Sequence, residues 1–120
     1  MTKEIELYKK FMEDLLKNRT DLYANSLRNG GRVFPAVGDE RLHDFCASLS
    51  DENKMILADV IQRTRDSAIF DTLEYLDDTV NRRGLKITQN GVEFPNNFFG
   101  GDFHCDWAAL CQGGMWKQDG

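Results

Sequence analysis

The sequence predicts a mainly α fold, a small orthogonal helical bundle around one long central helix at about residues 50–80. That helix is indicated by a marked start and by the absence of proline and glycine as far as Gly84. Ser50 can act as its N-cap, and two acidic residues follow where the helix dipole favours negative charge. After Gly84 the periodicity changes from helical to alternating, which predicts a C-terminal β-hairpin at about residues 85–94.

The central helix has one apolar face in its first half and two in its second half. In the second half, Ile69, Phe70 and Leu73 occupy the side that polar residues hold earlier. Leaving these side chains exposed would forgo about 1.5–3 kcal/mol of burial for each of them. This half is therefore either the axis of the domain or half of an interface. The face of the first half consists of Leu57, Ile61, Thr64 and Ala68, with Ile56 and Val60 widening it.

Two helical segments are expected before the central helix. Apolar residues recur at helical spacing over residues 2–28, with a weak point at residues 18–21 where either one helix bends or two helices meet with Thr20 as a cap. One helix is favoured, and the glycines after Asn29 end it. Asp39 can cap a second, short helix. Its predicted inner face consists of Leu42, Phe45, Cys46 and Leu49.

Local turn and cap signals predict the C-terminal elements. Asn90-Gly91 between two β-prone arms is typical of a type I′ hairpin, which needs positive φ at both central positions. A two-stranded hairpin is marginal alone, so it should pack on helices, most naturally on the second half of the central helix. Asp102 can cap a short terminal helix that ends near Gln112.

Length and composition favour a small soluble domain. We expect the 120 residues to form a single domain over residues 1–120, with one core. No apolar run approaches the roughly 18 residues of a membrane span, and the N-terminus lacks the apolar core of a signal peptide. Three cysteines form no disulfide pattern, so a cytoplasmic protein with reduced thiols is expected. The net charge of −5 argues against nucleic acid as a partner.

The sequence shows no strong metal or nucleophile motif. His104, Cys105, Asp106 and Cys111 are the densest group of metal-ligand types, but helical neighbours point about 100° apart and would rarely share one ion. His43 with Cys46 lacks the surroundings of a catalytic pair. We therefore predict no metal, no cofactor and no catalytic residue.

A buried polar site is the alternative that would suit an enzyme. Asp71 lies between the two apolar faces of the central helix, so we expect it to bond within the fold. A small hydrolase or ligand-binding domain would use such groups in a pocket. The candidate residues are Asp66, Asp71 and His104.

An aromatic C-terminal segment is either a second core over the central helix or an exposed interaction surface. Six aromatic residues fall within 23 residues, between Phe94 and Trp116. Aromatic side chains dominate both cores and interface centres. The candidate interaction surface comprises Ile69, Phe70, Leu73, Phe98, Phe99, Trp107 and Trp116.

Four parts of the chain, at residues 49–58, 65–76 and 89–93 and at the pair Asp106-Trp107, carry a resemblance. They resemble small bacterial proteins classed only as domains of unknown function. The resemblance covers about residues 49–116 and implies a bacterial cytoplasmic protein, but no activity. In its small size and acidic composition the chain is also similar to immunity proteins that neutralise a toxin.

These observations favour a non-enzymatic domain that binds a protein partner or a second copy of itself. An immunity-type inhibitor is one version of this prediction, and the small hydrolase or ligand-binding domain is the alternative. A binder should present a flat or ridge-like patch, whereas an enzyme should present a pocket where several polar groups meet.

Overall fold

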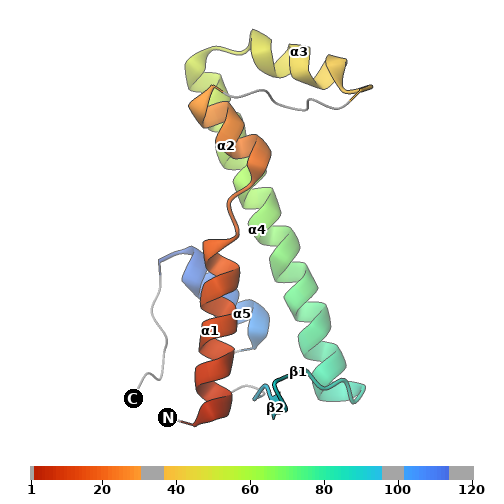
Figure 1. Ribbon diagram of the computed structural model, residues 1–120. Coiled ribbons are helices and arrows are strands. Elements are labelled where there is room, and N and C mark those ends of the chain that lie inside the picture. Colours follow the sequence, from red (N-terminus) through yellow and green to blue (C-terminus); the bar gives the residue numbers. More distant parts are fainter. Residues whose placement is uncertain (1, 31–36, 96–101, 114–120) are drawn as a thin grey trace. The chain divides into compact units, whose positions relative to one another are not determined.

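The computed structural model describes residues 2–30, 37–95 and 102–113, and these residues form five helices and one antiparallel hairpin (Figure 1). The mainly α class, the long central helix, the hairpin and the short terminal helix are thereby confirmed. None of the described helices is long and apolar enough to cross a membrane. The elements are α1 (Lys3–Lys17), α2 (Leu22–Asn29), α3 (Glu40–Ser48), α4 (Asp51–Arg82), β1 (Thr88–Gln89), β2 (Val92–Glu93) and α5 (Phe103–Cys111).

The central helix α4 begins and ends where the local sequence predicts. The hydroxyl of Ser50 accepts a hydrogen bond from the backbone N–H of Asn53 at 3.2 Å, as expected of an N-cap. At the other end Gly84 takes a left-handed conformation, with φ of 78°, and the N–H of Leu85 donates to the carbonyl of Thr79 at 3.2 Å. Glycine reverses the chain here without the steric cost of a side chain.

The N-terminal region forms two helices, so the prediction of one helix over residues 2–28 is wrong. Helix α1 ends at Lys17, and α2 begins after Asp21. The Asp21 carboxylate accepts hydrogen bonds from the N–H groups of Tyr23 at 2.8 Å and Ala24 at 3.1 Å. Two otherwise unpaired helix donors are satisfied in this way, which stabilises a new helix start.

The chain divides into two compact units. The middle unit comprises residues 19–65, and the terminal unit comprises residues 1–18 together with 66–120. Helix α4 contributes its first half to the middle unit and its second half to the terminal unit. A single domain over residues 1–120 stays a prediction, and each unit is described by itself.

The terminal unit has an aromatic core that covers the second half of α4. Ile69 and Phe70 pack against this core, and the Trp107 Nε1–H donates to the carbonyl of Asp66 at 3.0 Å. Of the two alternatives for this half of α4, the structure supports a helix buried in its own unit. The core residues are Tyr8, Met12, Leu73, Phe94, Phe103 and Trp107.

The hairpin forms as predicted, and it packs on α1. Asn90 and Gly91 have φ of 53° and 78°, the positive values of a type I′ turn. The Phe94 ring lies 5.1 Å from that of Phe11 and 6.2 Å from that of Tyr8, both on α1. The sequence predicts that the hairpin packs on the second half of α4. In the structure Leu73 of that half belongs to the same core as Phe94.

The middle unit has a small core that holds α2 and α3 to α4. Its buried residues are Ala24 and Leu27 of α2, Cys46 of α3 and Ala58 of α4. The side chain of Gln62 accepts from the N–H of Asp21 and donates to the carbonyl of Arg19, each at 2.9 Å. This amide therefore ties the start of α2 to α4.

Candidate functional site

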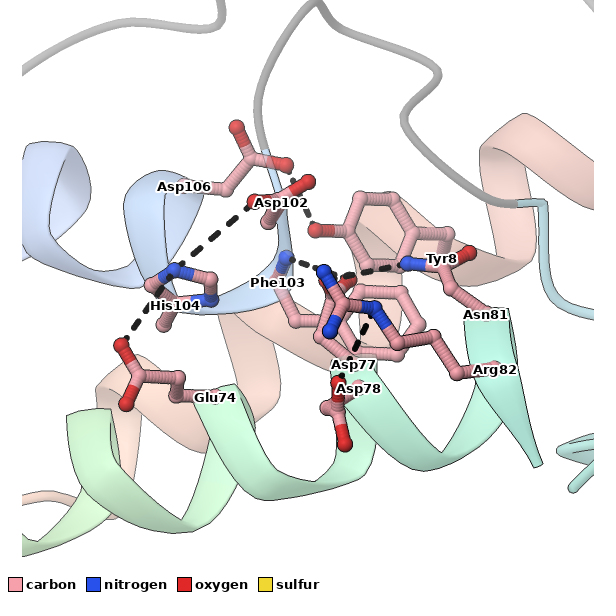
Figure 2. A network of polar contacts seen from close by, with 10 residues as sticks. All are labelled: Tyr8, Glu74, Asp77, Asp78, Asn81, Arg82, Asp102, Phe103, His104 and Asp106. Atoms are coloured by element: carbon pink, nitrogen blue, oxygen red, sulfur yellow. Dashed lines mark hydrogen bonds and ion pairs between the residues drawn. The ribbon is translucent and has the colours of Figure 1, made fainter.

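A network of polar side chains surrounds the start of α5 in the terminal unit (Figure 2). Its carboxylates come from the second half of α4 and from α5, and α1 contributes a tyrosine. The sequence does not indicate this network, because two of its hydrogen-bonded residues, Tyr8 and Asp106, are 98 positions apart. The network contains one helix cap, one buried hydrogen bond and one histidine beside two carboxylates.

Asp77 on α4 caps the N-terminus of α5. Its side chain is 6% exposed, and its Oδ1 accepts a hydrogen bond from the N–H of Phe103 at 3.4 Å. Its Oδ2 accepts from the amide of Asn81 at 3.1 Å. Asp102 occupies the N-cap position but its side chain makes no cap hydrogen bond. Asp77, a residue of another helix, therefore accepts from a backbone N–H of the first turn.

Burial raises the pKa of the Asp77 carboxyl above its ordinary range. Loss of hydration is the main cause, and the negative charge of Asp102 acts in the same direction. The hydrogen bond from the N–H of Phe103, the charge of His104 and the amide of Asn81 all oppose the increase. The capping carboxylate is therefore held in the fold at an electrostatic cost.

Replacing Asp77 by asparagine is expected to remove one contribution to the pH dependence of the free energy of unfolding in the acid range. A carboxyl with a higher pKa in the folded protein binds more protons there than in the unfolded chain. The free energy of unfolding of the natural protein therefore falls as pH rises from about 3.9, the unfolded pKa, through the raised folded pKa. Asparagine does not titrate, yet its Oδ1 can still accept from the N–H of Phe103.

Urea unfolding at several pH values from about 4 to 7 measures this difference. The control is Asp71→Asn, because Asp71 is exposed on the same helix and should leave the profile unchanged. Parallel profiles for Asp77→Asn and the natural protein would contradict the prediction.

Tyr8 and Asp106 form a buried hydrogen bond between α1 and α5. The Tyr8 hydroxyl donates to Oδ2 of Asp106 at 2.6 Å, and both side chains are buried. Burial, followed by the hydrogen bond and the charge of Asp106, strongly raises the pKa of the Tyr8 phenol. Tyr8 therefore keeps its proton at physiological pH and acts as a donor within the fold.

His104 lies between two carboxylates without reaching hydrogen-bond distance of either. Its Nε2 is 3.8 Å from Oε2 of Glu74 and 3.8 Å from Oδ2 of Asp102, and its side chain is 13% exposed. Its ring packs edge-on against Phe70, with centroids 5.1 Å apart. Among the described residues, nothing accepts from or donates to its buried Nδ1.

His104, Asp102 and Cys105 each offer one ligand atom, and these atoms all lie within 4.8 Å of one another. In the sequence His104 and Cys105 form a group with Asp106 and Cys111, and the offset of about 100° between helical neighbours disfavours a shared ion. In the structure Asp106 instead binds Tyr8, and Asp102 joins the group. Side chains of a first helical turn lean back toward the N-cap, which reduces the separation expected for neighbours.

The three residues of the predicted polar site do not gather at one place. Asp66 is half-buried, and its backbone carbonyl accepts from Trp107. Asp71 is exposed, so it is not the internally bonded carboxylate that the sequence suggested; its carboxylate can remain in water. Only His104 belongs to the network. The sequence does not single out Asp77, although its position indicates burial: it lies four residues, about one helical turn, after the buried Leu73.

The predicted interaction surface is mostly internal where the structure describes it. Leu73 and Trp107 are buried, and Ile69 and Phe70 are half-buried against the same core. Burial within the unit leaves little of these side chains for a partner. The remaining three predicted residues, Phe98, Phe99 and Trp116, lie outside the described residues.

Exposed apolar side chains gather instead on the first half of α4. Met55, Ile56 and Val60 are 48%, 55% and 54% exposed, and we call these three residues the exposed α4 face. At 100° per residue, Ile56 and Val60 lie about 160° around the helix from the buried Ala58, whereas Met55 lies about 60° from it. Glu52 and Arg63, both exposed, lie on the same side and flank the face one turn before and one turn after it. Ile56 and Val60, expected at the margin of the buried stripe, are therefore on the surface.

Two surface hollows of the terminal unit are lined by other residues. One, of about 120 Å³, lies between the end of α4 and the hairpin, with Phe94 and Phe103 in its wall. The other, of about 450 Å³, lies along α1 beside Asn90. Neither is lined by Asp66, Asp71 or His104, so neither is the polar pocket that the enzyme alternative requires.

Comparison with known proteins identifies a family without an assigned activity. The model of a family of unknown function, DUF6547, matches residues 1–118. No curated protein and no solved structure gives a match. The expected resemblance to proteins of unknown function is confirmed over a longer stretch than residues 49–116, while a bacterial origin stays a prediction.

Proposed function

The chain belongs to this family of unknown function, and we propose that it works as a self-associating module that pairs with a second copy through the exposed α4 face. The observation that carries the proposal is the exposure of three large apolar side chains on α4, two of which, Ile56 and Val60, lie on the side away from the buried Ala58. Contiguous apolar surface of this kind is typical of interaction sites.

The charges that flank the face are complementary to those of a second copy. In an antiparallel pairing centred between Leu57 and Ala58, Glu52 of each copy lies opposite Arg63 of the other. Met55 and Val60 lie opposite each other in the same register, and Ile56 lies opposite Asp59. A twofold axis produces every contact twice, so two apolar pairs would be flanked by two opposite-charge pairs. Among the described residues neither Glu52 nor Arg63 has an ion-pair partner within its own chain.

The charge balance of the middle unit also suits pairing with itself. Residues 19–65 contain seven Lys or Arg and seven Asp or Glu, so the whole net charge of −5 lies in the rest of the chain. Two copies of a neutral unit approach each other without net repulsion. The exposed α4 face lies entirely within this unit.

Charge reversal at the two flanking residues tests the proposal. Glu52→Arg and Arg63→Glu each place like charges opposite one another twice per dimer, so each should weaken self-association at least about tenfold. The double variant restores opposite charges with the signs exchanged and should recover most of the affinity. Sedimentation equilibrium over a range of protein concentrations measures the dissociation constant.

Asp71→Arg is the matched control, because it reverses an exposed charge on the same helix outside the face. It should leave the dissociation constant unchanged. A natural protein that remains monomeric at every concentration would overturn the proposal, and so would single reversals without effect. A monomer that forms a stable complex with an unrelated protein would also overturn self-association and would support binding to a different protein. The immunity-type inhibitor, which is one form of such binding, stays a prediction.

A further inference from the structure

We propose that Asp102, His104 and Cys105 form a binding site for a divalent transition metal at the first turn of α5, with Zn²⁺ as the ion expected from the donor set. This inference is independent of self-association, because the three residues belong to the terminal unit and the exposed α4 face to the middle unit. A carboxylate oxygen, an imidazole nitrogen and a thiolate sulfur are all ordinary zinc ligands.

The three ligand atoms are nearly close enough to share one ion. They lie within 4.8 Å of one another, whereas bond lengths of about 2.0–2.3 Å place ligands roughly 3.3–3.6 Å apart around a tetrahedral ion. Cys105 is exposed and Asp102 is half-buried, so both have room to move by about an ångström through side-chain rotation. His104, the most buried of the three, would provide the fixed point.

The carboxylate of Asp102 is available because another residue performs its usual task. An aspartate at an N-cap normally accepts from the backbone of the first turn. Here Asp77 accepts from the N–H of Phe103, and the side chain of Asp102 makes no cap bond. Asp102 is held in extended backbone, with φ of −88° and ψ of 171°, just before the turn that carries His104 and Cys105.

The imidazole of His104 needs a partner that the described residues do not supply. Its Nδ1 is buried without a hydrogen bond, and its Nε2 is 3.8 Å from each of two carboxylates, beyond hydrogen-bond length. Leaving a mostly buried polar ring unsatisfied is costly. A metal ion bound at Nε2 would satisfy that nitrogen and draw the carboxylates toward it, and Nδ1 would be left for a bond to water.

Glu74 is placed to act as a fourth ligand or to border an open position. Its Oε2 lies 3.8 Å from Nε2 of His104, on the side of α4, and Figure 2 shows the imidazole between Glu74 and Asp102. Together with Asp77, these carboxylates make the surroundings of His104 negative. A bound cation would offset this charge, and a water molecule could complete the shell if Glu74 stays exposed.

Titration with Co²⁺ tests the site on the full chain after reduction of its thiols and removal of metals with a chelator. Tetrahedral Co²⁺ with a thiolate ligand absorbs visible light and shows a sulfur-to-cobalt charge-transfer band in the near ultraviolet. We expect one Co²⁺ per chain and displacement of Co²⁺ by Zn²⁺. Cys105→Ser should remove the charge-transfer band. His104→Gln and Asp102→Asn should weaken binding by at least about tenfold, since even residues that only orient ligands contribute 10–100-fold.

Cys111→Ser and His43→Gln are the matched controls, each removing the same ligand type elsewhere in the chain, and both should bind Co²⁺ like the natural protein. Circular dichroism of each variant establishes that the helices are retained. No saturable Co²⁺ absorption, or a charge-transfer band that survives Cys105→Ser in a folded variant, would overturn the proposal. The mass of the Co²⁺-free protein reports self-association separately, so failure of one proposal is distinguishable from failure of the other.

Discussion

Replacing Trp107 by alanine is expected to lower the free energy of unfolding by about 3–5 kcal/mol, the range for large aromatic residues in a protein core. Its side chain is 1% exposed and lies in the aromatic core of the terminal unit. The substitution removes this packing and also the hydrogen bond from the indole Nε1–H to the carbonyl of Asp66. Because natural domains are stable by only about 5–15 kcal/mol, such a loss is close to unfolding the unit.

Urea unfolding followed by far-ultraviolet circular dichroism measures this effect. Tyr75→Ala is the matched control, because it also truncates an aromatic side chain of the terminal unit, but one that is 58% exposed. The control should change the free energy of unfolding by less than about 1 kcal/mol. Similar losses for the two variants would contradict the assignment of Trp107 to the core.

Replacing Tyr8 by phenylalanine is expected to cost about 1.5–3 kcal/mol, the range for a hydrogen bond to a charged group. Phenylalanine fills the same space, so the loss comes from the hydrogen bond to Asp106 rather than from a cavity. Urea unfolding at neutral pH measures the difference. Tyr75→Phe removes an exposed hydroxyl and should leave the free energy of unfolding nearly unchanged. An equally small loss for Tyr8→Phe would show that its hydrogen bond to Asp106 contributes little to stability.

The same variant should also change the alkaline stability profile. Because the pKa of Tyr8 is strongly raised in the fold, the folded protein holds this proton when the unfolded tyrosine, with a pKa of about 10, has lost it. The free energy of unfolding of the natural protein therefore falls as pH rises above about 10. Tyr8→Phe lacks this contribution, so the difference between the two proteins should shrink as pH rises.

Features governed by neighbours in sequence were predictable. The cap at Ser50, the left-handed Gly84 and the Asn90-Gly91 turn depend on backbone preferences of a few adjacent residues, and all appear in the structure. The second apolar face around Leu73 was also visible in the spacing, although the spacing left open whether it was covered by the chain itself. The break near Asp21 was misjudged because helical periodicity continues on both sides of it.

The cap at Asp77 and the position of Glu74 beside His104 depended on contacts between distant residues. In the sequence Asp77 is one of several acidic residues of α4, and only its approach to Phe103 makes it a cap and leaves the carboxylate of Asp102 without a cap bond. Likewise, the approach of His104 to Glu74 requires α4 and the start of α5 to meet, whereas Asp102 and Cys105 are neighbours of His104 in the sequence.

The sequence by itself therefore determined the class of the protein: a long helix with defined ends, shorter helices beside it and a type I′ hairpin, because capping and periodicity are local properties. Only the tertiary structure decided which apolar residues are covered. The small core around Ala58 faces one side of α4 and leaves Ile56 and Val60 exposed, whereas the aromatic core encloses Leu73 and Trp107. Spacing shows which residues share a face, but burial depends on what packs against that face.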